Sequence, residues 1–164
     1  MEHRLKTPEQ LLAFKPLKRV LAAKAPGAHA VAPGTSIFDA LRLMAEKEIG
    51  FLVVLDGAGL VGVVSERDYA RKVVLQGKAS GNTPVQDIMT REVVSVGLAH
   101  TIPDCLALMN QHGLRHLPVI DADAVIGVLS VRDLLKEIVD HHERLIRTLE
   151  LEKSTLLNTS GSHY

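Results

Sequence analysis

The chain has 164 residues, enough for one substantial hydrophobic core or two small ones. It is 46% hydrophobic, and its 19 basic and 19 acidic residues cancel, which excludes a disordered chain and an electrostatic footprint for nucleic acid or an anionic membrane. Its single cysteine, Cys105, excludes an internal disulfide. No apolar run has membrane-spanning length and no signal peptide begins the chain, so we expect a cytoplasmic location.

The N-terminal part of the chain predicts two helices. The first lies within residues 1–19, where Thr7 precedes a proline at the first helical position. The second follows Thr35 or Ser36 as N-cap, with apolar residues at helical spacing from Ile37 to Met44.

A β-hairpin is predicted after the second helix. The apolar runs Phe51–Leu55 and Leu60–Val64 flank an Asp-Gly turn, and a further helix starts after Ser65. Residues 20–76 therefore read as one unit of strand, helix, strand, strand and helix.

The second half of the chain repeats this unit. Val20–Val74 aligns without a gap with Val85–Val139, and 16 of the 55 aligned positions are identical. We therefore expect a second unit over 85–139, with a Gly/Ser/Asn/Pro-containing linker over 77–84. Residues 140–157 extend the last helix with an apolar stripe, and 158–164 are expected to form a disordered tail.

Both units carry one motif at the start of their last helix. It reads Gly-Val-Val-Ser-Glu-Arg-Asp at Gly62–Asp68 and Gly-Val-Leu-Ser-Val-Arg-Asp at Gly127–Asp133. With Leu117–Asp121 and Asp87–Thr90, this pattern resembles the stand-alone bacterial proteins that carry a tandem pair of CBS domains (a Bateman module). The resemblance implies an α+β fold in which two β-α-β-β-α units pack about a pseudo-two-fold axis, and it implies that such modules commonly pair as dimers.

The resemblance also implies a ligand. Modules of this family hold adenosine compounds in two clefts between the units, and AMP is the ligand we expect first, then ADP, ATP or NAD(H). Asp68 and Asp133 lie in the first turn of a helix, where a carboxylate can accept two hydrogen bonds from a ribose diol. The alternative is that each Asp only complements the helix N-terminus and that Ser65 and Ser130 are plain N-caps.

The two clefts differ in their expected chemistry. In the cleft closed by Ser130 and Asp133, Arg115 and His116 stand where family members place phosphate-binding side chains, whereas the first unit has Gly50 and Phe51. We expect this cleft to bind more tightly. Its expected contacts, including main-chain contacts from the segment 24–28 and an apolar wall at Ile49, are Lys24, Ala28, Ile49, Gly50, Arg115, His116, Val128, Ser130 and Asp133.

The other cleft takes its residues from the first motif and from the start of the second unit. The basic residues Arg67 and Arg71 are candidates for phosphate, although solvated helix charges are an equal alternative. The expected contacts of this cleft are Ser65, Arg67, Asp68, Thr90, Arg91, Val93 and Leu114.

The remaining sequence patterns do not indicate a functional site. The glycines from Gly57 to Gly62 fit a dinucleotide fingerprint but lie in a predicted hairpin, so we interpret them as turn glycines. His141 and His142 are interpreted as a solvated polar face rather than metal ligands, and Cys105 as a small core residue. No set of acid, base and nucleophile indicates catalysis, so an enzyme is not expected.

Two functions remain. The leading hypothesis is a non-catalytic adenosine-nucleotide sensor, and the alternative is a protein-interaction module with vestigial clefts, in which Val131–Leu157 docks a partner helix. In either case we expect a homodimer, because a free module exposes its helical face and the apolar stripe of its last helix.

Overall fold

The computed structural model describes residues 13–24 and 27–160, with side chains described up to residue 155. The helix start expected at Thr7 and the end of the expected tail, 161–164, lie outside the described residues.

The first unit contains a three-stranded sheet. Its strand order is β1-β2-β3, with β1 parallel to β2 and β2 antiparallel to β3. The elements up to the linker are α2 (Leu17–Ala22), β1 (Ala30–Val31), α3 (Ile37–Glu46), β2 (Phe51–Asp56), β3 (Gly59–Ser65), α4 (Glu66–Lys72) and the short helix η1 (Val74–Gln76).

The second unit repeats the first, except that the counterpart of strand β1 is shortened. The antiparallel pair β4-β5 has the register of β2-β3, with the irregularity at the same place, between Val119 and Ile120. The strand that would match β1 is a single parallel bridge from Val96 to Val119. Its elements are η2 (Val85–Asp87), α5 (Ile102–His112), β4 (His116–Asp121), β5 (Ala124–Ser130) and α6 (Val131–Ser160). The predicted α+β fold of two units is confirmed.

The helices begin where the capping residues predict. Ser36, Ser65 and Thr101 each accept a hydrogen bond from the backbone N–H three residues further on, and the last two form full capping boxes. Ser130 does the same for Asp133. Helix α6 runs to Ser160, beyond the expected end at Leu157, because the first helix-breaking residue after Val131 is Gly161.

The two units exchange the segments that precede them. Leu17 and Val20 pack in the core of the second unit, whereas Val85, Ile88 and Met89 pack in the core of the first. Thr90 also forms a two-way backbone bridge with Val63 of β3. The units interlock in space, and each core is completed by residues that the sequence repeat assigns to the other unit or to the chain before it.

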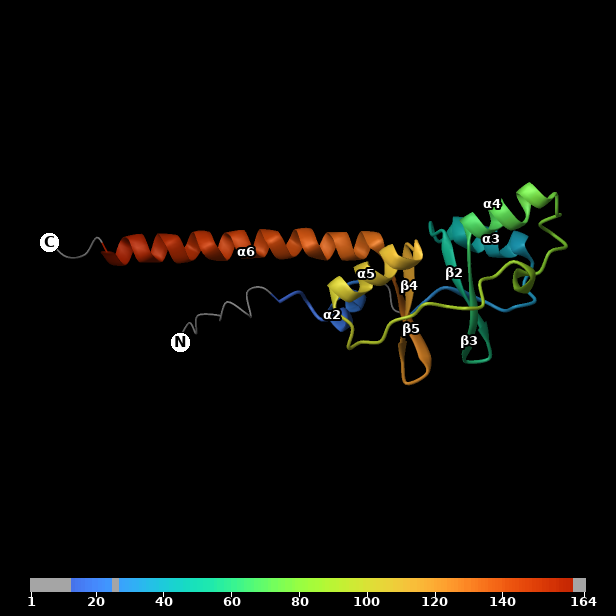
Figure 1. Cartoon of the computed structure of the whole chain (residues 1–164), viewed down its shortest axis with the longest axis horizontal. Helices are drawn as coiled ribbons and strands as arrows, with labels where there is room; N and C mark the ends of the chain where they lie inside the picture. Colours follow the sequence, from blue (N-terminus) through green and yellow to red (C-terminus); the bar gives the residue numbers. More distant parts are fainter. Residues whose placement is uncertain (1–12, 25–26, 161–164) are drawn as a thin grey trace.

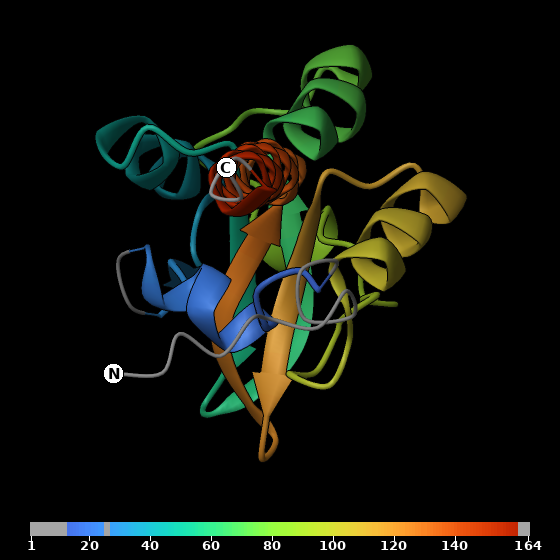
Figure 2. The same cartoon turned by 90° about the vertical axis from the view of Figure 1, so that its left-hand side faces the viewer.

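The hairpins of the two units lie side by side, with β3 against β5. Helices α2 and α5 lie next to the β4-β5 hairpin, and α3 and α4 lie next to the β2-β3 hairpin (Figure 1). Helix α6 starts on the second unit and continues far beyond it as a straight rod. Figure 2, which looks along this rod, shows α3, α4 and α5 spread around its axis. Among the described residues, no helix combines the length and apolar character needed to cross a membrane.

Candidate functional site

The junction of β5 and α6 places Asp133 at the centre of one candidate site. Its Oδ2 accepts hydrogen bonds from the Ser130 backbone N–H at 2.7 Å and from the Ser130 hydroxyl at 2.8 Å. The ammonium of Lys24 donates to the same oxygen at 2.6 Å. Oδ1 makes no hydrogen bond with the described part of the chain. One carboxylate oxygen is therefore saturated and the other remains available to accept.

Lys24 reaches this site from the segment after α2. Its ammonium also donates to the Val128 carbonyl at 2.8 Å. In the first unit the equivalent carbonyl, that of Val63, accepts from the Thr90 backbone N–H at 2.8 Å. The sequence predicted main-chain contacts from residues 24–28 here. Those contacts were expected to adenine and stay a prediction; in the structure the Lys24 side chain joins the Val128 carbonyl to Asp133, which Ser130 also contacts.

The charges in this site favour an ionised Asp133 and a neutral His116. Burial opposes ionisation of Asp133, but the hydrogen bonds from Lys24 and Ser130 outweigh it and hold the pKa of the carboxyl below its ordinary value. Burial lowers the pKa of His116, and the cations Arg115 and Lys24 lower it further. His116 is therefore uncharged at neutral pH and offers a hydrogen bond rather than a charge.

Arg115 and His116 take up different positions. Arg115 is exposed and its guanidinium has no partner among the described residues, so it is free to meet an anion. The ring of His116 stacks on Phe51, with centroids 4.8 Å apart and planes at 17°. Nearby, Gly50 leaves room for Glu66, whose Oε2 lies 2.6 Å from where a Cβ would stand. Ile49, the expected apolar wall, packs against the first core.

The matching site in the first unit is centred on Asp68. Its Oδ2 accepts from the Ser65 backbone N–H at 3.0 Å and from the Ser65 hydroxyl at 2.7 Å. Its Oδ1 is 2.7 Å from the ammonium of Lys72, which also donates to the Ile88 carbonyl at 2.6 Å. Both oxygens of Asp68 are therefore occupied, unlike those of Asp133.

The other residues expected around Asp68 are arranged less compactly. Arg67 donates to the Gly113 carbonyl at 3.3 Å, beside Leu114, and so spans from the first motif to the second unit. Arg91 donates to the Gln86 carbonyl at 3.0 Å, within its own loop. Leu114 packs on the second core, Val93 is half-buried, and Thr90 is held at β3.

Sequence reasoning missed the role of Lys72. It lies four residues after Asp68 on one helix, a spacing that itself predicts an ion pair. The aligned residue in the second unit is Glu137, so the same pair cannot form there and Lys24 takes its place.

A second polar cluster ties the N-terminal segment to α6. Glu137 is 5% exposed and accepts from Lys15 at 3.1 Å and from Arg144 at 2.6 Å. His141, 6% exposed, packs against Phe14 with ring centroids 4.6 Å apart. The interpretation of His141 as part of a solvated face is wrong, because Phe14 covers it, whereas His142 is exposed. Within the described ranges no three His, Cys, Asp or Glu side chains gather as a metal site would require.

Two smaller interpretations are confirmed. Cys105 is fully buried in the second core, and burial raises the pKa of its thiol to about 11. Gly57 has a φ of 60° in the turn between β2 and β3, and Gly62 lies within β3 rather than at a helix start. The dinucleotide fingerprint is therefore a chance match.

The fold and the repeated Ser-x-x-Asp sites define a tandem module of two related units. The family model described as "CBS domain" matches residues 25–75 and 85–140. The chain belongs to the CBS-domain family.

Its relatives include proteins of plants and bacteria. It is 34% identical over 119 residues to the mitochondrial CBS domain-containing protein CBSX3 of Arabidopsis thaliana, covering 70% of this chain and 58% of CBSX3. It is 34% identical over 104 residues to CBS domain-containing protein YhcV of Bacillus subtilis, covering 63% of this chain and 74% of YhcV. The chain thus spans little more than half of CBSX3.

Solved structures show the same arrangement. A protein with CBS domains from Burkholderia ambifaria is 43% identical, with a TM-score of 0.74, and the match covers 77% of this chain and 95% of that one. The CBS domain pair of protein MJ0100, solved in complex with 5′-methylthioadenosine and S-adenosyl-L-methionine, is 23% identical with a TM-score of 0.68, covering 77% and 98%. At that identity the likeness to MJ0100 shows the fold alone.

Proposed function

We propose that this chain is a non-catalytic sensor of adenosine nucleotides and that the cleft at Asp133 is its principal site. The observation that carries the proposal is Oδ1 of Asp133, which accepts no hydrogen bond from the described residues, while Lys24 contacts Oδ2 and His116, adjacent in sequence to Arg115, lies within electrostatic reach. The carboxylate suits a ribose hydroxyl, and the two permanent cations suit a phosphate. AMP is the ligand we place first, followed by ADP, ATP and NAD(H). MJ0100, which shares the fold, binds adenosine-containing ligands.

The difference between the two aspartates supports unequal clefts. A ribose at Asp68 competes with Lys72, because each carboxylate oxygen already has a partner. A ribose at Asp133 has one oxygen open to it. The cleft at Asp133 therefore binds more tightly, and the cleft at Asp68, with Thr90, Arg91, Val93 and Leu114 around it, is the weaker one.

Lys24 gives the proposed sensor a route from ligand to structure. A nucleotide that draws the Lys24 ammonium toward its phosphate takes it from the Val128 carbonyl and Asp133. Because Lys24 follows α2, which packs in the second core, this exchange acts on the N-terminal segment. Regulation then requires that ligand bind two positions of that segment with different affinity.

A thermal-shift screen tests the proposal. With AMP, ADP, ATP or NAD(H) at millimolar concentration, at least one ligand raises the melting temperature of the wild-type chain. In calorimetry, Asp133→Ala weakens nucleotide binding more than Asp68→Ala, which is a matched control because both carboxylates cap a helix in the same way. No shift with any of the four ligands favours the interaction module with vestigial clefts, and the reverse order of the two variants contradicts the assignment of the principal site.

We further propose a homodimer in the cytoplasm. The composition of the chain supports the location. The exposed apolar residues Phe38, Leu135 and Val139 on the helical side support self-association.

A further inference from the structure

The distal part of α6 has no counterpart in the family match. That match ends at residue 140, whereas α6 continues to Ser160 and leaves the two units behind (Figure 1). A single helix of this length gains little stability from its own hydrogen bonds in water, and most helices are stabilised by packing an apolar face. The distal half of α6 therefore calls for a partner.

Helix α6 carries two adjacent faces with different roles. The inner face includes Leu134, Glu137 and His141, which are buried against the second unit and the segment around Phe14. The outer face lies one residue further along, about 100° around the helix. It exposes four large apolar side chains to roughly half of their area: Leu135 at 53%, Val139 at 56%, Ile146 at 55% and Leu149 at 51%.

The outer face follows a heptad repeat. Its members alternate steps of four and three residues, and we call them the outer stripe: Leu135, Val139, His142, Ile146, Leu149 and Lys153. Read as d-a-d-a-d-a, the first two a positions hold β-branched Val139 and Ile146, and the d positions hold Leu135 and Leu149 with the polar His142 between them. This distribution favours two-stranded parallel coiled coils, and a lone Lys at an a position, here Lys153, fixes register.

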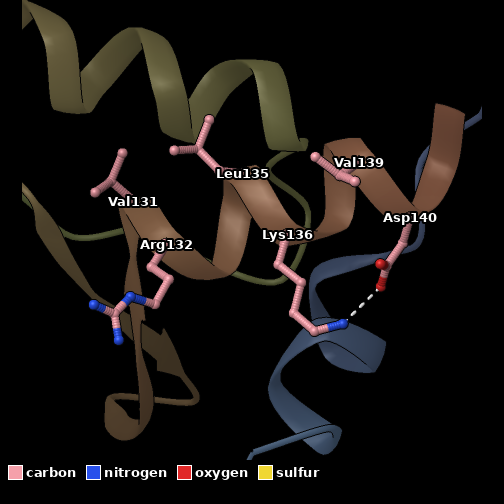
Figure 3. Close-up of a pocket in the computed structure, with 6 residues that line it drawn as sticks. All are labelled: Val131, Arg132, Leu135, Lys136, Val139 and Asp140. Carbon is pink, nitrogen blue, oxygen red and sulfur yellow. Dashed lines mark hydrogen bonds and ion pairs between the residues drawn. The ribbon is translucent and has the colours of Figure 1, made fainter.

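The stripe begins beside an open hollow. This hollow of about 580 Å³ is lined by Val131, Arg132, Leu135, Lys136, Val139 and Asp140. Figure 3 shows the three apolar side chains on one side of the helix, with Arg132 and Lys136 directed away from them. Lys136 is held by Asp140 at 2.9 Å. The apolar strip is therefore bordered by Arg132 and by the Lys136–Asp140 pair, an arrangement that suits contact with a facing helix.

We propose that the outer stripe pairs with the outer stripe of a second copy of this chain, in parallel and in register. The second copy is the occupant because the stripe is self-complementary: each β-branched a residue and each leucine d residue meets its own equivalent across a parallel pair. The proposal deepens the proposed homodimer by naming its interface, and it does not depend on a nucleotide in either cleft.

Oligomeric state in solution tests the interface. Sedimentation equilibrium of the full chain at micromolar concentration gives a dimer, and Leu149→Asp weakens its association by roughly tenfold or more. Leu151→Asp is the matched control, because Leu151 is 70% exposed on the same helix but lies outside the stripe, and it leaves the dimer intact. A monomeric wild type, a dimer that survives Leu149→Asp, or equal dissociation by Leu151→Asp each overturns the proposal. Capture of a different protein by a monomeric chain overturns it as well.

Disulfide trapping tests the orientation. The native thiol of Cys105 is fully buried, so any disulfide between two copies must come from the added cysteine. Val139→Cys and Leu149→Cys each oxidise to a covalent dimer if the helices are parallel and in register, while Leu151→Cys does not. An antiparallel pair places at most one of the two positions beside its own equivalent, so a covalent dimer from only one of them overturns the parallel arrangement.

Failure of this interface is separable from failure of the nucleotide proposal. A thermal shift with AMP that persists in a monomeric Leu149→Asp chain supports both proposals. A wild-type dimer without any nucleotide shift overturns only the sensor, and a wild-type monomer with a shift overturns only the helix pair.

Discussion

Phe51 and His116 occupy equivalent positions in the two units and stack on each other, with ring centroids 4.8 Å apart. The pseudo-two-fold axis therefore passes close to an aromatic pair made from one position of the repeat. The sequence difference that suggested a phosphate ligand, His in place of Phe, also lies at the contact between the units. Packing and binding can be separated at this residue by experiment.

Replacing His116 by Phe keeps the stacked pair and removes the ring nitrogens. We expect His116→Phe to change the free energy of unfolding by less than about 0.5 kcal/mol, whereas His116→Ala lowers it by about 1–2 kcal/mol. Both variants weaken AMP binding to a similar extent if a ring nitrogen meets the phosphate. Urea denaturation and calorimetry measure the two effects, and equal loss of stability in both variants contradicts a packing role.

Replacing Lys24 by Met tests its dual contact with Asp133 and with ligand phosphate. AMP binding weakens by about five- to tenfold, because a charge-assisted contact is lost. Adenosine, which has no phosphate, binds no more weakly, because Lys24 no longer competes for the carboxylate. Calorimetry with both ligands gives the two affinities.

The control for Lys24→Met is Lys72→Met, which frees Asp68 in the other cleft. This variant leaves AMP affinity at the principal site within about twofold. An equal loss of AMP and adenosine affinity in Lys24→Met instead indicates that Lys24 only supports the fold.

Gly62 and Gly127 occupy equivalent positions in the two units, and each leaves too little room for a side chain. A Cβ on Gly62 meets the Thr90 carbonyl oxygen at 3.0 Å and Met89 Sδ at 2.7 Å, whereas on Gly127 it meets Leu21 Cδ2 at 2.9 Å. A leucine methyl can turn aside, but the Thr90 carbonyl cannot, because it accepts a hydrogen bond from the Val63 backbone N–H while the Thr90 N–H donates to the Val63 carbonyl. Gly62→Ala therefore lowers the free energy of unfolding by about 1–3 kcal/mol, and Gly127→Ala by less than about 1 kcal/mol. Denaturant titration ranks the pair, and the opposite order refutes this explanation.

The sequence predicted local structure well because the repeat supplied each element twice. Ser36, Ser65 and Thr101 cap helices as their spacing indicated, and the hairpins follow the apolar runs. The long-range partners were not predictable in the same way. Val20 and Val85 are identical and aligned, yet each packs in the core on the opposite side of the pseudo-two-fold axis. A periodic pattern shows that a residue is buried, not which core buries it.

The candidate site shows the same limit. The motif placed Ser130 and Asp133 correctly at a helix start, since that is local geometry. The contact of Lys24 with Asp133 joins residues from opposite ends of the module, and no local rule predicts it. His141 was misread for a related reason, because its cover, Phe14, comes from the other end of the chain.

Glu137 makes the stability of the module depend on pH. Burial favours its protonated form, but the hydrogen bonds from Arg144 and Lys15 outweigh that effect and hold the pKa of the carboxyl below its ordinary value of 4.5. The folded chain therefore binds this proton less readily than the unfolded chain. The stabilisation is complete above about pH 4.5 and is lost as the pH falls through the lowered pKa.

Glu137→Gln removes this contribution. At neutral pH we expect the free energy of unfolding to fall by about 1–2 kcal/mol, a modest loss because Lys15 and Arg144 are 40% and 44% exposed and regain water. Burial and the charge of Arg144 also lower the pKa of the neighbouring His141. Because His141 is present in both the variant and the wild type, its contribution largely cancels when their free energies of unfolding are subtracted. Urea denaturation from pH 7 to pH 3 should show that difference shrinking below about pH 4.5, while Glu143→Gln, on an exposed pair, stays within about 0.5 kcal/mol of the wild type throughout. A difference between Glu137→Gln and the wild type that stays constant across this range would mean that the carboxyl acts through shape alone, since only an ionised group with a lowered pKa can lose its contribution on protonation.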